Sequence, residues 1–225
     1  MLAVNLGLKT VQSFNFKNIE FWFKPLVIRD LTIIKQHINS ITHDDAKTQQ
    51  ELIDFFNVAY SEVVRYVSNT RNSEFKLYRM SEKTLKTYSP NTFLEFQKRV
   101  KYNISHLFEL NQMAKSCEIS ILNEDTRNQT SIPANSVDII VSSPPYGDSK
   151  TTVAYGQFSR LSLKFLGYEE NSVRKIDRTS LGGISARDFH LSLFSQTLEK
   201  EVSEIQKIDE KRALEVVSFY QDFIK

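Results

Sequence analysis

The chain has 225 residues, enough for one large domain or two small ones with a buried core. Its 40% hydrophobic and 25% charged residues are typical of a soluble globular protein, and a net charge of +2 gives no overall basic excess that would indicate a nucleic-acid partner. We find no secretory signal and no apolar run of membrane-spanning length, and the single cysteine excludes an internal disulfide and suits a reducing cytoplasm.

The first half of the chain shows the spacing of amphipathic helices. Aromatic residues crowd the aperiodic stretch 11–24, which we expect to be a loop pinned to the core by its rings. Asp44 and Asp45 can cap a helix that follows them. The polar stretch 68–80 predicts a loop that enters a short strand. Apolar residues at helical spacing predict helices over 25–41, 46–67 and 91–108. The first has the 4-3-4-3 spacing of one buried stripe, and the apolar residues of the third share one face, at Phe93, Phe96, Val100, Ile104, Leu107 and Phe108.

The second half predicts two short strands among further helices. Ile119 and Ile121 mark one strand, and the apolar run 137–141 marks a second, buried strand. Cys117 is expected to be a small buried hydrophobe. Two or three strands are too few for a stable parallel sheet, so we predict a helix-rich α/β fold with an incomplete sheet. The remaining segments predict helices over 155–166, 186–207 and 209–224, the last capped by Asp209, with a loop over 167–185.

A polar loop with two prolines follows the second predicted strand and reads Ser142-Ser143-Pro144-Pro145-Tyr146-Gly147. The prolines end the strand, because neither can donate an N–H to a sheet ladder. In open α/β sheets, ligands bind at the carboxyl ends of strands. This loop is therefore the predicted active site.

Ser-Pro-Pro-Tyr after an apolar strand resembles the catalytic motif of the amino-methylating DNA methyltransferases, and the serine form is most similar to the cytosine-N4 branch. The resemblance covers roughly 58–168 and includes "YSEVVRYVSNTRNSEFKLYR" and "TTVAYGQFSRLSLKFLG". It implies a Rossmann-like, S-adenosylmethionine-dependent fold that methylates DNA in a restriction-modification context. By this resemblance, 116–225 is a partial catalytic domain, and 1–115 is a helical region that contacts DNA or recognises the target.

The resemblance assigns roles within the loop, and the chemistry of cytosine supports them. The exocyclic amine is a poor nucleophile because its lone pair is delocalised into the ring. Acceptors at Ser143 Oγ and the Pro144 carbonyl would favour the pyramidal amine, and Pro144 and Pro145 hold these acceptors in place. Tyr146 would stack on a base extruded from the duplex. Gly147 allows the backbone to approach a ligand closely.

Binding of the methyl donor is predicted to be incomplete in this chain. The resemblance implies that Asp125 contacts the adenine of S-adenosylmethionine, with Glu124 as a competitor and a simple Asx-type turn as the alternative reading. The family's glycine-rich donor loop is missing, because no glycine lies between Gly7 and Gly147. We therefore expect a second polypeptide to supply that loop. The four histidines have no metal-ligand spacing, so no metal is expected.

DNA contacts and the reaction itself leave alternatives open. The alternatives to cytosine-N4 methylation are adenine-N6 methylation and a catalytically inactive remnant that acts as a nucleic-acid-binding or assembly module. Methylation of RNA is a weaker alternative. The cations predicted to contact the DNA backbone are Arg65, Arg71, Lys76 and Arg79, with Lys98, Arg99 and Lys101 behind them.

Overall fold

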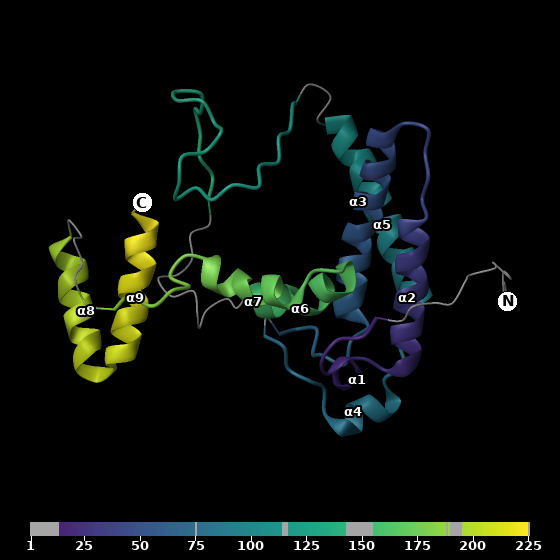
Figure 1. Cartoon of the computed structure of the whole chain (residues 1–225), viewed down its shortest axis with the longest axis horizontal. Coiled ribbons are helices and arrows are strands. Elements are labelled where there is room, and N and C mark those ends of the chain that lie inside the picture. Colours follow the sequence, from purple (N-terminus) through teal and green to yellow (C-terminus); the bar gives the residue numbers. More distant parts are fainter. Residues whose placement is uncertain are drawn as a thin grey trace, which may run out of the picture. The chain divides into compact units, whose positions relative to one another are not determined.

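The computed structural model describes residues 14–74, 76–113, 117–142, 155–187, 189 and 195–224. Within these residues, regular secondary structure is α-helical, and Figure 1 labels the nine helices. The helices predicted to begin near 25, 46, 91, 155 and 209 are confirmed. The bounds are α1 Ile19–Trp22, α2 Pro25–Asn39, α3 Ala46–Tyr66, α4 Glu82–Thr87, α5 Thr92–Met113, α6 Tyr155–Leu166, α7 Glu170–Thr179, α8 Gln196–Ile208 and α9 Glu210–Phe223.

The chain divides into two compact units. Unit 1 comprises Met1–Ser116 and Gln157–Val173, so it contains α1 to α5 and most of α6. Unit 2 comprises Cys117–Gly156 and Arg174–Lys225, with α8, α9 and the extended stretch that leads toward the predicted catalytic loop. The functional roles predicted for 1–115 and 116–225 stay predictions. No helix in the described part of the chain is long and apolar enough to cross a membrane.

The core of unit 1 forms where the apolar stripe of α2 packs against α3. As the 4-3-4-3 spacing predicts, one face of α2 is buried, with at most 4% exposure at Val27, Leu31, Ile34 and Ile38. Tyr60 of α3 is fully buried, and its hydroxyl donates to the Leu31 carbonyl at 3.1 Å. Asp45 caps α3 as predicted, because its Oδ2 accepts from the Thr48 N–H at 2.7 Å.

An aromatic cluster fixes α6 to the amino-terminal part of unit 1. Phe165 is fully buried, and its ring centroid lies 4.9 Å from those of Phe14 and Phe23 and 5.5 Å from that of Phe16. This confirms the prediction that the rings of 11–24 pin their segment to the core. The segment also contains a short helix, α1, which its aperiodic sequence did not indicate.

The apolar face predicted for the helix that begins near 91, α5, is only partly buried. Phe96 and Val100 are partly buried. Phe93, Ile104, Leu107 and Phe108 are 45 to 66% exposed. Helical spacing shows which residues share a face, but burial requires a neighbouring element. Among the described helices, α5 packs mainly against α2 and α3.

The two strands predicted in unit 2 are not formed. Ile119, Ile121 and Ile139 to Val141 are 68 to 93% exposed. The described residues contain one isolated antiparallel bridge, between Thr70 and Arg79 in unit 1. Strands need a neighbour to satisfy their N–H and C=O groups, and no described element offers one. The helix-rich part of the predicted fold is therefore shown, whereas its sheet is not. Cys117, predicted to be buried, is exposed.

Unit 2 is built on a helical hairpin. Helices α8 and α9 pack together and bury Val202, Ala213 and Val217. Asp209 caps α9 as predicted, because its Oδ1 accepts from the Arg212 N–H at 3.0 Å. The helix predicted over 186–207 begins only at Gln196. The predicted loop over 167–185 contains α7, whose only apolar side chains are Val173 and Ile176, too few to form a readable stripe.

Replacing Phe165 should separate α6 from the core of unit 1. We expect Phe165→Ala to lower the free energy of unfolding by about 3–5 kcal/mol, because it leaves a cavity among three phenylalanine rings. Urea unfolding followed by the fluorescence of Trp22, the only tryptophan, measures this loss. The matched control is Phe93→Ala on α5, which should cost less than about 1 kcal/mol because Phe93 is 45% exposed. Equal losses would contradict the packing of α6.

Candidate functional site

The predicted catalytic loop lies outside the described residues. This applies to Ser143, Pro144, Pro145 and Tyr146, and to Gly147, which was predicted to lie against the cofactor. Their roles stay predictions. The described residues contain the other predicted positions, namely the acidic turn before the loop and the four cations expected to contact DNA.

Asp125, predicted to contact the methyl donor, forms a tight turn with Arg127. Its Oδ1 accepts from the Arg127 N–H at 3.1 Å, which is the Asx-type turn considered as the alternative reading. The Arg127 side chain also binds both carboxylate oxygens, with Nε 2.9 Å from Oδ1 and Nη2 2.6 Å from Oδ2. The turn is therefore shown, and the contact with adenine stays a prediction.

Arg127 fastens this turn to the rest of unit 2. Its Nη1 binds Asp222 Oδ2 on α9 at 3.0 Å, and its Nη2 donates to the Thr179 carbonyl at 2.8 Å. Glu124, the predicted competitor of Asp125, instead accepts from the Ser131 N–H at 2.8 Å. Hydrogen bonds from Ser131 lower the pKa of the Glu124 carboxyl, which keeps it ionised. The two acidic side chains thus have different partners.

The polar loop 68–80 is anchored by buried polar side chains. Ser68, Asn69 and Thr70 are at most 4% exposed. The Asn69 N–H donates to the Trp22 carbonyl at 2.7 Å, and the hydroxyls of Ser68 and Thr70 share a hydrogen bond of 2.7 Å. Because buried polar groups are costly unless bonded, these contacts fix the loop in one conformation.

Arg65 was predicted to contact DNA, but in the structure it holds the loop in place. It is 7% exposed, and its Nη2 donates to the Glu74 carbonyl at 2.6 Å while Nη1 donates to the Phe158 carbonyl at 3.2 Å. The guanidinium carbon also lies 4.7 Å from the centroid of the Phe158 ring. Burial lowers the pKa of this guanidinium, although arginine stays protonated in proteins. Arg65 therefore connects α3, the loop and α6.

The other three predicted cations differ in burial and in whether their side chains already have bonding partners. Arg79 donates through Nε to the Phe21 carbonyl at 3.0 Å, stacks on the Phe21 ring and pairs with Glu82. Lys76 is partly buried. Arg71 is exposed at the start of the loop, and its guanidinium has no partner in the described residues. The structure therefore leaves Arg71 as the most available of the four for a phosphate.

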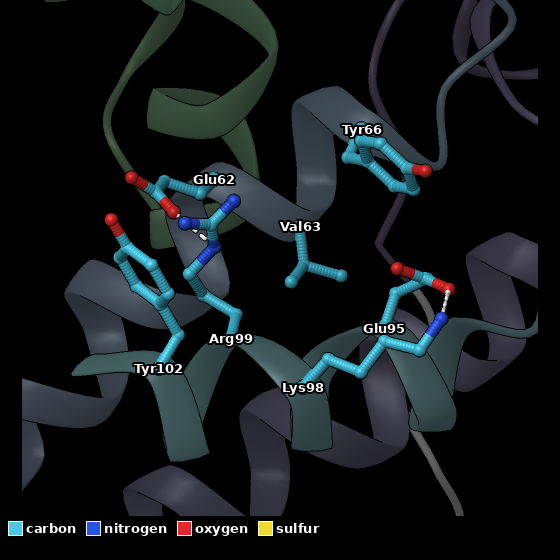
Figure 2. A pocket seen from close by; sticks show the side chains of 7 residues that line it. All are labelled: Glu62, Val63, Tyr66, Glu95, Lys98, Arg99 and Tyr102. Atoms are coloured by element: carbon cyan, nitrogen blue, oxygen red, sulfur yellow. Dashed lines mark hydrogen bonds and ion pairs between the residues drawn. The ribbon is translucent and has the colours of Figure 1, made fainter. Parts of the chain in front are cut away.

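A hollow of about 520 Å³ lies between α3 and α5 of unit 1. Figure 2 shows Tyr66 and Tyr102 at opposite ends of it, with Arg99 between them. Arg99 pairs with Glu62 at 2.5 Å and lies over the Tyr102 ring, 5.2 Å from its centroid. Glu95 and Lys98 form a second pair, at 2.8 Å. The lining therefore combines two aromatic rings with two ion pairs.

A second hollow, of about 420 Å³, adjoins the first along α3. Glu62, Tyr66 and Arg99 line both, and the second continues past Arg65 toward α6 and the loop residue Asn72. Of these, Arg65 and Arg99 were predicted from the sequence to contact DNA, whereas Glu62 and Tyr66 were not predicted to have a role. Their four-residue separation on α3, which places them on one helix face, is the signal that could have found them.

No cluster of metal-ligating side chains exists in the part of the chain that the structure describes. The residues that line the two hollows are suited to organic ligands instead, because they offer aromatic faces, carboxylate acceptors and guanidinium donors.

Comparison with known proteins connects the chain with methyltransferases. No protein-family model matches it, and no solved structure matches it. It is similar to the Type II methyltransferase M.MvaI of Kocuria varians, with 43% identity over 225 residues. The similarity covers 94% of this chain and 48% of the relative, so the chain spans about half the relative's length.

Removing the Arg65 guanidinium should loosen the loop 68–80. We expect Arg65→Met to increase the rate of trypsin cleavage after Arg71 about tenfold or more, because a hydrogen bond to a charged group contributes about 1.5–3 kcal/mol. Mass spectrometry of timed digests measures the rate. The control is Lys101→Met on α5, which removes an exposed cation and should leave the cleavage rate after Arg71 unchanged. Equal rates in both variants would contradict the anchoring role of Arg65.

Proposed function

We propose that this chain carries the target-base half of a DNA methyltransferase that modifies the N4 amine of cytosine in a restriction-modification context. The observation that carries the proposal is the 43% identity, over 94% of the chain, to a protein named as a Type II methyltransferase. The loop Ser143-Pro144-Pro145-Tyr146 adds the choice of base, because its serine form resembles the cytosine-N4 branch.

The residues of the loop act on the amine of the target base. Ser143 Oγ and the Pro144 carbonyl accept its two N–H bonds and favour the geometry in which the nitrogen lone pair can attack. Pro145 restricts the backbone that carries these acceptors, and Tyr146 stacks on the extruded base. The donor, S-adenosylmethionine, supplies an electrophilic methyl group.

The described residues do not form a donor site by themselves. Asp125, the acidic residue proposed to meet the adenine, is already held by Arg127 through both carboxylate oxygens. The sequence also lacks the family's glycine-rich loop, so Gly147 is the only predicted glycine contact with the donor. We propose that this loop comes from outside these 225 residues, on a second polypeptide or another segment.

The same outside segment would supply the missing strands. Ile119, Ile121 and 137–141 have the composition of buried strands, yet they are exposed and unpaired. Neighbouring strands would satisfy their backbone groups and cover their side chains, which would complete a Rossmann-like sheet. Donor binding and sheet formation are thus proposed to depend on one another.

On the DNA side, Arg71 is proposed to bind a backbone phosphate. It is exposed, and the loop that carries it is fixed by buried hydrogen bonds, so little conformational entropy is lost when it binds. Lys76 is partly buried, so we expect it to contribute less to phosphate binding than Arg71 does. Arg65 and Arg79 donate hydrogen bonds to the carbonyl groups of Glu74 and Phe21, so they are less available to DNA than Arg71 is.

The reaction is tested with the full chain and a complementing segment, for which the unmatched half of the relative is a ready source. We expect Ser143→Ala to lower methylation turnover about a hundredfold, because one aligned polar group is lost at the reacting amine. Tyr146→Ala should also reduce turnover, and both variants should bind DNA as the unchanged chain does. Ser142→Ala, which removes the neighbouring hydroxyl, is the matched control.

Analysis of the methylated nucleoside decides between the alternatives. N4-methylcytosine supports the proposal, whereas N6-methyladenine would favour the adenine reading. Turnover in Ser143→Ala equal to that of the control would refute the role of Ser143. DNA binding without any methylation, in every complemented mixture, would favour the inactive nucleic-acid-binding module.

Donor binding is tested by calorimetry. We expect the isolated chain to bind S-adenosylmethionine only weakly, and the complementing segment to restore binding together with hydrogen-exchange protection of 119–121 and 137–141. If donor binding and hydrogen-exchange protection appear together when the segment is added, this supports the proposal that the segment completes the sheet. Tight donor binding by the isolated chain would overturn the proposal that the site is incomplete.

A further inference from the structure

The hollow between α3 and α5 is electrically balanced, which narrows the kind of ligand it can take. Glu62 pairs with Arg99 and Glu95 pairs with Lys98, so each cation has its own carboxylate. A bare phosphate would meet two carboxylates as well as two cations, and it would have to displace a pair to bind. A neutral planar group with both hydrogen-bond donors and acceptors fits this lining better.

Tyr66 supplies the face on which such a group can stack. Its side chain is 49% exposed, and within the described residues its ring has no stacking partner and its hydroxyl no hydrogen bond. Its backbone carbonyl accepts from Asn72 at 3.0 Å and from the Tyr88 hydroxyl at 2.7 Å. The main chain beneath the ring is therefore held in place while the ring itself is free.

Tyr102, at the opposite end of the hollow, is already stacked. The Arg99 guanidinium lies over its ring, and the His106 ring centroid lies 4.0 Å from its own. These contacts fix the Arg99 side chain in place. Its Nε is used by Glu62, which leaves other N–H donors of the guanidinium available for a ligand.

We propose that this hollow binds a nucleobase, with Tyr66 stacking on its face, Glu62 accepting from its amino group and Arg99 donating to its ring nitrogen or carbonyl oxygen. Carboxylates and guanidinium groups are the side chains that pair with the amino and carbonyl edges of bases. Aromatic stacking is what holds bases that have left a duplex. The volume of about 520 Å³ is within the range of small-molecule sites.

This assignment rests on the proposed methylation of DNA for its source of bases. Extruding the target from a duplex leaves its former partner unpaired, and that partner base is then free to stack on a protein side chain. The adenine of the methyl donor is a second source of the same chemistry. The two sources share one recognition mode, and separate probes distinguish them.

The experiment measures binding of the 225-residue chain to two probes. Fluorescence anisotropy compares a labelled duplex that carries one bulged guanine, the base left unpaired when a cytosine is extruded, with the fully paired duplex. Calorimetry measures binding of adenosine. We expect the chain to prefer the bulged duplex about tenfold, because stacking on an aromatic side chain supplies that order of affinity. Tyr66→Leu should abolish this preference, and Tyr66→Phe, which keeps the ring, should retain it.

The control variant is Tyr168→Leu, because Tyr168 is also an exposed tyrosine of unit 1 but lines neither hollow. Its preference for the bulged duplex should be unchanged, and the urea midpoints of all variants should agree. If Tyr66→Leu instead removes adenosine binding and leaves the duplex preference intact, the site is assigned to the donor's adenine. No loss with either probe overturns the nucleobase site.

Neither probe requires methyl transfer, so the two proposals fail separately. A complemented enzyme that methylates DNA normally as Tyr66→Leu, with unchanged affinity for both probes, would refute the nucleobase site and leave the methylation intact. If Tyr66→Leu loses the preference for the bulged duplex but no complemented mixture methylates DNA, the nucleobase site is supported and the proposed methylation is refuted.

Discussion

The packing of Phe165 among three other phenylalanine rings is the contact on which the organisation of unit 1 depends. The chain leaves this unit after α5 and returns to it at α6, and the buried ring holds the return. A hydrogen bond of 2.6 Å from Ser162 Oγ to the Ser61 carbonyl fixes the same helix to α3. The segment 117–156 therefore starts and ends at unit 1, and the predicted catalytic loop comes shortly before its end in the sequence.

Arg65 links this core to the surface that we assign to DNA. Its buried guanidinium joins α3 to the loop 68–80 and to α6, so the position of the loop follows from the packing of the two helices. Arg71 belongs to the anchored loop, and Tyr66 is the residue next to Arg65 on α3. The proposed phosphate contact and the proposed base contact therefore share one support, which would keep their spacing constant as DNA binds.

Local patterns made most of the helices predictable from sequence. The stripe of α2 and the caps at Asp45 and Asp209 depend on residues a few positions apart, and the sequence contains all of that information. The two predicted strands are not formed, because strand pairing depends on residues that are distant in sequence. Within the described residues, neither 119–121 nor 137–141 has a pairing partner. Helix α7 was missed because it has too few apolar residues to show a period.

The candidate site was predictable to a smaller extent, for a related reason. The resemblance of Ser143 to Tyr146 identified the loop, and the turn at Asp125 was foreseen as one of two readings. The role of Arg65 was not foreseen, because an arginine looks the same in a sequence whether it is solvated or bonded to carbonyl groups. The hollow beside Tyr66 depends on how α3 and α5 pack, which periodicity does not determine.

The exposed run 137–141 also bears on how the chain behaves in concentrated solution. Its four aliphatic residues have high β-propensity and unpaired backbone groups, which is the composition of segments that nucleate intermolecular β-structure. Asp138 carries the only charge in this window, so it has the position of a gatekeeper residue that opposes self-association. This single carboxylate is therefore the only charge within the run that opposes its self-association.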